Sequence, residues 1–464
     1  MVRDTSTLGI PGEAGAGERY RAVTRSNIDR RPQWEKLDPD LRDAVMTVSS
    51  VLPFRTNAYV MDELIDWDNV PDDPIFRLTF PMAAMLDDED FSHMRQLVHA
   101  GASKAELEAA ATPIRMKLNP HPAGQMSHNV PHVDGEPIPG MQHKYRETVL
   151  FFPSHGQTCH AYCTFCFRWA QFVGSDDLKF ANKEASQLRR YLEQHPEVTD
   201  VLFTGGDPMI MRSSVFANYV DEVLKVETVR TVRIGTKSVA YWPQRFTTDA
   251  DADEMLRIFE RVVDAGKHLA IMGHYNNAVE LSTPIAREAV RRIRSTGANI
   301  RMQSPLIRRI NDSSDDWANL WTTGTQLGCI PYYMFVERDT GAKSYFELPL
   351  AECWEIFQKA YQRVPGTART VRGPSMSCFP GKCHVLGVSE IAGEKAFVLE
   401  FLQARDPSLV RRPFFAKFDP TASWYDDLQP FSKSDEPFFI KPEVETTPLT
   451  VRTRSELSRG VLVN

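Results

Sequence analysis

The chain has 464 residues, of which 42% are hydrophobic and 25% are charged, and its formal net charge is −7 at pH 7. These values are ordinary for a globular protein and give no overall electrostatic attraction to nucleic acid or to an anionic membrane surface. The sequence has no apolar run of the roughly 18 to 20 residues that a membrane-spanning helix needs. We therefore expect a cytoplasmic protein that binds neither nucleic acid nor a membrane.

The N-terminal part divides into two predicted segments. Residues 1–31 are rich in Gly, Arg, Ser and Thr without apolar periodicity, which predicts a flexible segment. Residues 32–142 are expected to form a helical region that ends in a long irregular connection. Its helices are indicated by apolar residues at spacings of three and four, in the stretches 41–51, 61–66, 91–100 and 104–111.

Residues 143–385 alternate between strand and helix patterns. Apolar or β-branched runs predict six strands, at 149–152, 201–204, 229–234, 269–273, 300–303 and 330–335. Amphipathic helices are predicted between the later strands, at 183–194, 214–226, 251–265, 284–295 and 314–327. Repeated βα units require parallel strands, and six in a row favour an incomplete (βα)6 TIM-like barrel over an open doubly wound sheet. Residues 386–464 form a predicted C-terminal extension without assigned chemistry.

Three cysteines follow the first predicted strand in a C-x3-C-x2-C pattern: Cys159, Cys163 and Cys166. Three thiolates can hold three irons of a [4Fe–4S] cluster and leave the fourth iron open to a small chelating molecule. A structural zinc site remains an alternative, since His155 or His160 could supply a fourth ligand. Disulfides are disfavoured because three cysteines cannot pair evenly and no secretory signal is recognised.

Two more cysteines, Cys378 and Cys383, flank a Phe-Pro-Gly-Lys turn. They are candidates for a second metal site or for small hydrophobic core residues, and the sequence leaves both interpretations open.

Other polar residues are expected at the carboxyl ends of the strands, where parallel barrels carry their active sites. Gly205, Gly206 and Asp207 end the second strand; the glycines permit close backbone approach and Asp207 offers a carboxylate to a cationic group, although the same residues make an ordinary tight turn. The fourth strand ends at His274 and the fifth at Gln303. A structural role explains a lone histidine equally well.

Together these residues resemble the radical S-adenosylmethionine enzymes and, among them, the lysine 2,3-aminomutase family. The general signature is C-x3-C-x-aromatic-C, with Phe165 as the aromatic residue. The similarity spans residues 115–385 and includes these stretches in the family's order: His143-Lys144-Tyr145, Thr204-Gly205-Gly206-Asp207, Arg233-Ile234-Gly235-Thr236, Pro243-Gln244-Arg245, Gln303-Ser304-Pro305-Leu306, Ile310-Asn311-Asp312 and Pro331-Tyr332-Tyr333.

The resemblance implies that S-adenosylmethionine chelates the open iron and is split by one electron to a 5′-deoxyadenosyl radical. The electron would come from a donor such as flavodoxin or ferredoxin. The resemblance also implies that Gly205, Gly206 and Asp207 hold the methionine end, with His274 and Gln303 as further contacts. In the family, the radical acts on an amino acid bound to pyridoxal 5′-phosphate, and its nitrogen moves from Cα to Cβ.

Residues for pyridoxal phosphate and substrate follow from the same resemblance. Arg168 matches the arginine that pairs with the substrate α-carboxylate, a role suited to a bidentate guanidinium; a surface arginine is the alternative. Pro380-Gly381-Lys382 keeps the ends of the family's Pro-Gly-Gly-Gly-Gly-Lys turn. Lys382 is thus the expected attachment point of pyridoxal phosphate, with Lys144 and Tyr145 near its phosphate and ring, although a lysine after such a turn is often only solvated.

The sequence departs from lysine-specific members at both acidic positions that pair with the lysine side chain. One is Arg338 here and the other is Cys378, which argues against free lysine as the substrate. If Arg338 faces the pocket, an acidic side chain such as that of glutamate is favoured. A register shift of one residue would place Asp339 there and reverse this inference. The family's C-terminal zinc cysteines are absent, so a homo-oligomer remains an open expectation.

The leading hypothesis is an isomerase, namely a radical S-adenosylmethionine amino acid 2,3-aminomutase that uses pyridoxal phosphate. One alternative is a radical enzyme without pyridoxal phosphate that modifies a peptide, a protein side chain or a small metabolite. A more distant alternative is a non-catalytic iron–sulfur sensor or scaffold.

Overall fold

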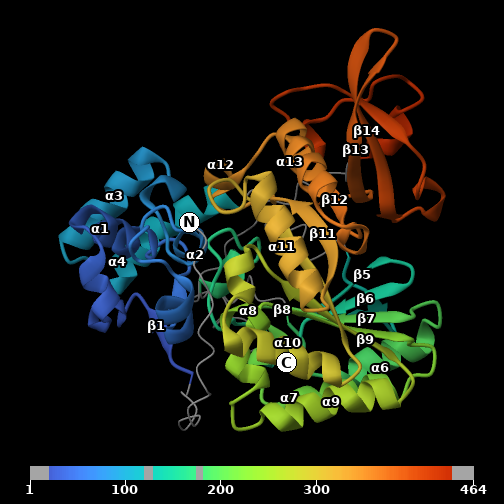
Figure 1. Ribbon diagram of the computed structural model, residues 1–464, viewed down its shortest axis with the longest axis horizontal. Helices are drawn as coiled ribbons and strands as arrows, with labels where there is room; N and C mark the ends of the chain where they lie inside the picture. The colour runs from blue at the N-terminus through green and yellow to red at the C-terminus, as the bar shows by residue number, and fades with distance from the viewer. Residues whose placement is uncertain (1–19, 120–128, 174–180, 441–464) are drawn as a thin grey trace, which may run out of the picture.

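A computed structural model describes residues 20–119, 129–173 and 181–440 (Figure 1). Residues 1–19 of the predicted flexible segment and residues 441–464 of the predicted extension lie outside the described residues. The remaining residues of the first segment include β1, which pairs with β2. The strands are β1 Ala22–Thr24, β2 Arg55–Asn57, β3 His132–Val133, β4 Glu136–Pro137, β5 Met141–Tyr145, β6 Thr148–Phe151, β7 Asp200–Phe203, β8 Thr231–Thr236, β9 His268–His274, β10 Asn299–Leu306, β11 Ile330–Val336, β12 Arg372–Ser377, β13 Gly381–Ile391, β14 Glu394–Ala404 and β15 Phe414–Lys417.

The helices in the same part of the chain lie mostly between these strands. They are α1 Pro39–Val48, α2 Pro74–Thr79, α3 Asp88–His99, α4 Lys104–Leu118, α6 Ala185–Gln194, α7 Ser213–Leu224, α8 Ser238–Tyr241, α9 Ala252–Asp264, α10 Pro284–Ser295, α11 Ser314–Gln326, α12 Lys343–Phe346 and α13 Leu350–Arg363. No helix among the described residues is both long and apolar enough to cross a membrane.

One sheet of eleven strands organises the fold, in the order β15-β14-β13-β12-β11-β10-β9-β8-β7-β6-β5. Strands β6 to β12 are parallel, whereas β5 at one end and β13 to β15 at the other are antiparallel to their neighbours. The predicted α/β class and all six predicted strands are confirmed as β6 to β11. The seventh parallel strand, β12, was missed because its sequence, Arg-Gly-Pro-Ser-Met-Ser, lacks a β-branched or continuous apolar run.

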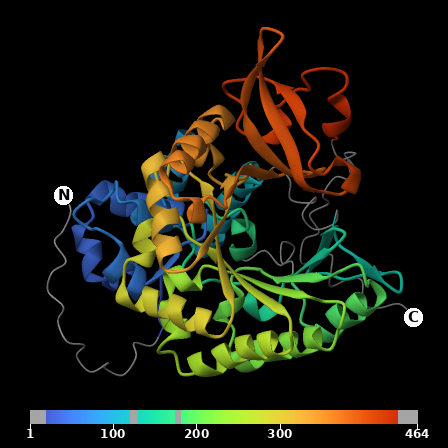
Figure 2. The same ribbon diagram turned by 45° about the vertical axis from the view of Figure 1, so that its right-hand side comes forward.

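Helices cover one face of the parallel strands. Figures 1 and 2 show α6, α7, α9 and α10 along the side away from β13 and β14. In β8 the buried residues are Val232, Ile234 and Thr236, and they alternate with partly exposed residues such as Arg233 and Gly235. Since side chains alternate between the faces of a strand, β8 places Arg233 and Gly235 on the face opposite its buried residues, whereas β9 is buried on both faces from Leu269 to Gly273.

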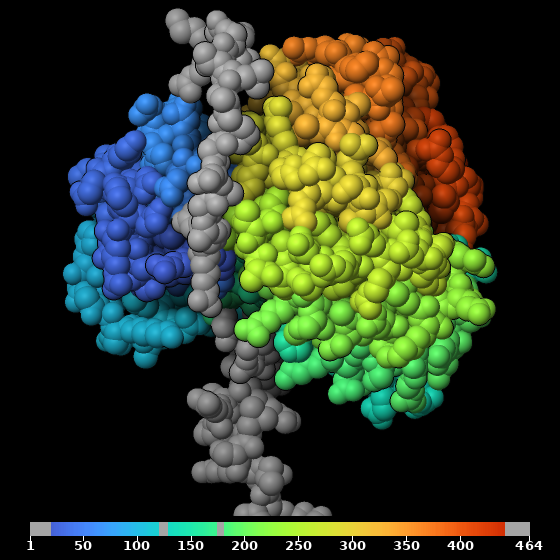
Figure 3. All heavy atoms as spheres, turned by 60° about the horizontal axis from the view of Figure 1, so that its bottom comes forward, coloured from blue at the N-terminus to red at the C-terminus, as the bar shows by residue number. Residues whose placement is uncertain are grey.

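The N-terminal helices lie to one side of the βα region, and Figure 3 shows the surfaces of the two regions next to each other. Local signals define their ends. The Asp38 side chain accepts from the backbone N–H of Leu41, and Ser103 forms a reciprocal capping box with Glu106. The helical expectation for this region is therefore confirmed, with the stretch predicted at 61–66 found as a single π-helical turn, Val60–Leu64.

The strands after α13 have an apolar core of their own. Phe397, Phe401 and Phe414 are fully buried there, and the Phe401 and Phe414 rings stack with centroids 5.1 Å apart. The sheet nevertheless continues from β12 into β13, so this core is joined to the parallel strands by backbone hydrogen bonds. Lys382, near the start of β13, is thereby fixed relative to the parallel strands.

Candidate active site

Most of the predicted site residues lie at one edge of the sheet, where the parallel strands have their carboxyl ends. Lys144 and Tyr145 instead end the antiparallel β5, where Tyr145 pairs with Thr148 at the start of β6. The register aligns Gln303 of β10 with His274 of β9 on one side and with Tyr333 of β11 on the other. At the start of β13, Lys382 is aligned with Ser377 of β12. The cysteine loop follows β6 and the Gly205-Gly206-Asp207 turn follows β7 at the same edge.

The N-terminal region holds the cysteine loop through backbone hydrogen bonds. The N–H of Tyr162 donates to Arg55 O at 2.8 Å, and the N–H of Thr164 donates to Leu78 O at 2.9 Å. The side chain of buried Asn57 donates to His160 O at 3.2 Å. The loop is thus clamped between the strand edge and the N-terminal helices.

Gly206 explains why the β7 turn needs glycine. A Cβ atom on Gly206 would lie 2.6 Å from both the backbone N and the backbone O of Thr158, the residue before Cys159. The next residue reinforces this approach, because the N–H of Asp207 donates to Thr158 O at 2.8 Å and to Gly156 O at 3.0 Å. The paired glycines therefore let the β7 turn lie directly against the cysteine loop.

The Asp207 carboxylate ties the end of β7 to the end of β8. One oxygen accepts from Met209 N at 2.9 Å and Thr236 Oγ1 at 2.7 Å. The other accepts from the backbone N–H groups of Lys237 and Ser238 and from Ser238 Oγ. Burial raises the pKa of Asp207, and these hydrogen bonds act in the opposite direction. The predicted contact of Asp207 with S-adenosylmethionine stays a prediction. In the structure, the hydrogen bonds of Asp207 connect the segment after β7 to the end of β8.

The three loop cysteines keep part of their surface exposed, whereas Cys329, Cys353, Cys378 and Cys383 are buried. Burial raises the pKa of Cys163 to about 11 and that of Cys166 to about 12, and it raises the pKa of Cys159 as well. The neighbouring thiols add to the rise at Cys159 and Cys166, so the triplet is close enough to interact electrostatically. Such thiols release their protons when a metal centre binds them.

The alternative of a single zinc ion finds no support in the described residues, which contain no group of three or more His, Cys, Asp or Glu arranged to hold one ion. His160 is engaged with Ser238 Oγ at 2.8 Å, and His155 lies 3.4 Å from the Tyr219 hydroxyl. A cubane cluster has a different requirement, because each cysteine binds a different iron and the sulfurs need not converge on one point. The donor set therefore fits a three-cysteine cluster.

Arg168 lies beside the triplet and is buried, so the alternative of a surface arginine is wrong. Its guanidinium donates to Gln171 Oε1 at 2.6 Å and lies 4.3 Å from the centre of the Phe152 ring. Its buried Nε has no hydrogen-bond partner, and burial lowers its pKa to about 10. A buried donor without a partner is costly, so this group is suited to a carboxylate of a bound ligand.

Lys382 is partly exposed, and aromatic rings lie beside its amine. Its Nζ lies 4.1 Å from the centre of the Tyr333 ring and 5.5 Å from that of Phe335. Burial, together with the positive charges of Arg233, Lys144 and Arg372, lowers its pKa to about 7. An amine with this pKa is about half neutral at pH 7, and its neutral form is nucleophilic.

Lys144 and Tyr145 at the end of β5 border the same space. Lys144 Nζ donates to Cys378 O, and burial lowers its pKa to about 8. The buried Tyr145 hydroxyl has no hydrogen-bond partner. The positive charge of Lys144 lowers the pKa of Lys382, so these two predicted neighbours are close enough to interact electrostatically.

The side chains of His274 and Gln303 lie at the ends of two neighbouring strands. His274 and Gln303 are both partly exposed and adjacent in the sheet. Burial and the charge of Lys237 lower the pKa of His274 to about 3, so its ring is neutral. Both side chains lie at the predicted edge, and their contact with S-adenosylmethionine stays a prediction.

Arg338 follows β11 and faces the Lys144 side of the site. Its positive charge lowers the pKa values of Lys144 and Tyr145, and its guanidinium lies 5.3 Å from the Trp424 ring. Asp339 is its ion-pair partner at 3.5 Å. The preceding residue, Glu337, is buried, and its charge raises the pKa values of Cys163 and Cys166.

Comparison with known proteins adds an independent observation. No family model matches the chain. A protein of Aquifex aeolicus named "Putative L-lysine 2,3-aminomutase" is 30% identical over 393 residues, which cover 85% of this chain and 92% of that protein. The chain belongs to the lysine 2,3-aminomutase family. L-lysine 2,3-aminomutase of Bacillus subtilis is 24% identical over 48% of this chain and 45% of its own. Streptococcus suis SuiB bound to S-adenosylmethionine aligns with 13% identity and a TM-score of 0.34, over 59% of this chain and 56% of that chain.

Membership in this family makes the chain a radical S-adenosylmethionine enzyme and implies a [4Fe–4S] cluster with S-adenosylmethionine as cofactors. The structure explains several of the matched stretches as supports for the site. Arg245 donates to Met209 O at 2.7 Å and thereby fixes the turn after Asp207. Asn311 donates to Asn276 O and Pro305 O, both at 3.1 Å, and so joins the ends of β9 and β10.

Sequence reasoning missed three buried residues near the site. They are Tyr241, Glu337 and Glu280, the last of which is the ion-pair partner of Lys237. The Tyr241 hydroxyl lies 3.4 Å from Cys163 Sγ. Lys237 Nζ pairs with Glu280 at 2.5 Å beneath the loop. These residues belong to no recognised spacing pattern. The signal that could have found them is their place in the segments that follow β8, β9 and β11.

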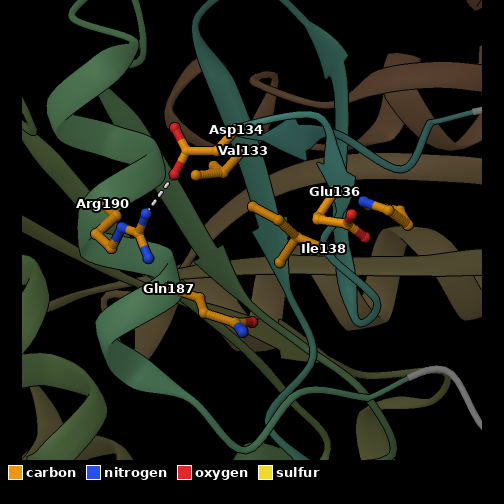
Figure 4. Close-up of a pocket in the computed structure, with 7 residues that line it drawn as sticks. Val133, Asp134, Glu136, Ile138, Gln187 and Arg190 are labelled. Atoms are coloured by element: carbon orange, nitrogen blue, oxygen red, sulfur yellow. Dashed lines mark hydrogen bonds and ion pairs between the residues drawn. The ribbon is translucent and has the colours of Figure 1, made fainter.

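Two other features lie away from this edge. Cys378 Sγ is hydrogen-bonded to Gly381 O and Cys383 is fully buried, so both pack in the C-terminal core; the second metal site is not supported within the described residues. A hollow of about 180 Å³ between the β3–β4 hairpin and α6 is bordered by the Asp134–Arg190 ion pair (Figure 4). None of the predicted site residues lines this hollow.

The approach of Gly206 to Thr158 generates a test. Gly206→Ala places a methyl group 2.6 Å from the Thr158 backbone, so the cysteine loop must shift, at a cost of about 1–3 kcal/mol. We expect the variant to fold, by circular dichroism, but to bind clearly less iron and sulfide after anaerobic reconstitution. Gly235→Ala is the matched control, because its Cβ would meet Thr204 Oγ1 at an ordinary 3.5 Å. Equal iron content in Gly206→Ala and the unmodified protein would contradict the account.

Proposed function

We propose that this chain is a radical S-adenosylmethionine amino acid 2,3-aminomutase that uses pyridoxal phosphate and acts on an amino acid other than free lysine. The proposal includes a partial barrel in which the concave face of β6 to β12 surrounds the reactants. Cys159, Cys163 and Cys166 ligate the cluster in this proposal. When bound, the cluster and S-adenosylmethionine supply the radical that removes a hydrogen atom, and pyridoxal phosphate supplies the conjugated ring that lets nitrogen move between adjacent carbons.

The β7 turn contributes the binding surface for the methionine end of S-adenosylmethionine. Because the Asp207 side chain is already engaged by five protein donors, we assign the contact to the backbone of Gly205 and Gly206, which Asp207 positions. His274 and Gln303 complete this part of the site.

The assignment of pyridoxal phosphate rests on the surroundings of Lys382. Its lowered pKa, its contact with the Tyr333 ring and its cationic neighbours fit a lysine that attacks an aldehyde while a phosphate lies close by. Arg233 and Arg372 place further positive charge near Lys382, and so does the ammonium of Lys144. The unpartnered hydroxyl of Tyr145 offers a hydrogen bond to the same group.

Arg168 and Arg338 divide the recognition of the amino acid between them. The unpartnered Nε of Arg168 is suited to the α-carboxylate, near the cysteine triplet. Arg338 faces the Lys144 side, where lysine-specific members would need an acidic group, and Cys378 occupies the second such position. A cationic wall disfavours a lysine side chain and favours an acidic one, because like charges in a buried site repel each other. Electrons for the cluster would come from a small redox protein such as flavodoxin or ferredoxin.

Attachment of pyridoxal phosphate at Lys382 is testable by chemistry. We expect borohydride reduction after incubation with pyridoxal phosphate to label Lys382, as found by peptide mass mapping, and Lys382→Ala to lose the visible absorption of the bound cofactor. The attachment rate should rise through pH of about 7 and level off above it, because only the neutral amine reacts. Lys417→Ala, on the exposed side of β15, should behave like the unmodified protein. Labelling elsewhere, or none, would exclude this assignment.

Substrate recognition is tested with a panel of isotope-labelled amino acids under reducing, anaerobic conditions. We expect release of 5′-deoxyadenosine and conversion of an acidic amino acid such as glutamate to its β-isomer, with no conversion of lysine. Arg338→Gln should lower kcat/KM for that substrate by about 100-fold, the effect of losing about 2.7 kcal/mol. Arg412→Gln, whose guanidinium packs 5.2 Å from the Phe438 ring, is the control.

Conversion of lysine by the unmodified protein would refute the substrate assignment. Release of 5′-deoxyadenosine with no amino acid rearranged would favour an enzyme that acts without pyridoxal phosphate on a peptide or another metabolite.

A further inference from the structure

Tyr241, the last residue of α8, contacts one of the three loop cysteines. Its hydroxyl lies 3.4 Å from Cys163 Sγ, within hydrogen-bond distance for sulfur. The side chain is 1% exposed, so no bulk water competes for the hydroxyl. Cys166 differs, since it receives a backbone hydrogen bond from Arg168 instead.

The direction of this hydrogen bond is fixed once Cys163 is a metal ligand. A thiolate has no proton to give, so the phenol O–H must be the donor. A phenol has an ordinary pKa of about 10 and so carries its proton at neutral pH, which leaves Tyr241 with an O–H to donate.

Contacts with Lys237 and Asn57 hold Tyr241 in place. Lys237 Nζ lies 4.5 Å from the ring centre and is itself paired with Glu280 and with Asn276 Oδ1 at 2.8 Å. The Tyr241 carbonyl accepts from Asn57 Nδ2 at 3.1 Å. These contacts fix the hydroxyl before any cofactor binds, so it need not reorient when the cluster changes charge.

We infer that Tyr241 is a positioning residue that raises the reduction potential of the cluster by donating its O–H to the sulfur of Cys163. Reduction adds one electron from an external one-electron donor and transfers no proton, so the cluster gains one negative charge. A fixed donor at a ligand sulfur stabilises that added charge, and hydrogen bonds to sulfur are a recognised control of cluster potential. The low dielectric around the buried hydroxyl strengthens the effect. The inference rests on the proposed function only in taking Cys163 as a cluster ligand.

The test is a mediated redox titration of the anaerobically reconstituted protein, followed by the electron paramagnetic resonance signal of the reduced cluster. Tyr241→Phe removes the hydroxyl and keeps the ring over which Lys237 lies. We expect its midpoint potential to be more negative than that of the unmodified protein. Tyr275→Phe is the matched control, because the Tyr275 hydroxyl is equally buried and has no hydrogen-bond partner; its potential should not change.

The iron and sulfide content of each variant distinguishes failure of the proposed function from failure of the inference about Tyr241. If the unmodified protein loads no cluster, the proposed function fails and this inference fails with it. If Tyr241→Phe loads the same iron and has an unchanged or higher potential, this inference alone is overturned. If Tyr241→Phe loads too little iron to titrate, the Raman spectrum of the unmodified protein is measured in H2O and in D2O. A shift of the Fe–S(Cys) bands in D2O supports the hydrogen bond, and the absence of a shift overturns the inference.

Discussion

The site depends on one close contact between two loops, the approach of Gly206 to the backbone of Thr158. A cluster loop is a stretch of irregular backbone with three reactive thiols, and it must be held without help from regular strand pairing. The β7 turn does this by touching the residue before Cys159 and by donating a hydrogen bond from Asp207 N to Thr158 O at 2.8 Å. The Asp207 carboxylate then locks the same turn to the start of α8, so loop, turn and helix form one rigid unit.

A second set of contacts links this unit to the half of the site that would hold substrate. Trp169, just after the cysteine loop, donates from Nε1 to Thr340 Oγ1 at 3.3 Å, and Thr340 lies two residues beyond Arg338. The sheet continues from β11 through β12 into β13, which carries Lys382. The group that would generate a radical and the groups that would hold its target are therefore joined by short, bonded paths. This arrangement suits chemistry in which a 1 Å displacement matters.

The sequence predicted the parts of the molecule that follow from local pattern. Strands β6 to β11 and helices α6, α7, α9, α10 and α11 have clear apolar periodicity, and the cysteine spacing identified the loop. The sequence could not reveal that Asp207 is saturated by protein donors, because four of its five partner groups belong to Thr236, Lys237 and Ser238, about 30 residues away in the chain. Burial of Arg168 and the lowered pKa of Lys382 likewise depend on segments that meet only in the folded sheet. Strand β12 was missed because neighbouring strands, and not its own side chains, impose its extended conformation.

The central claim is that Cys159, Cys163 and Cys166 hold a [4Fe–4S] cluster with one iron free of protein ligands. Mössbauer spectroscopy of protein reconstituted with ⁵⁷Fe, before and after addition of S-adenosylmethionine, tests it most directly. The account predicts a cubane cluster in which S-adenosylmethionine changes the parameters of a single iron. A spectrum without a cubane cluster, or a cubane spectrum that S-adenosylmethionine leaves unchanged, would contradict it.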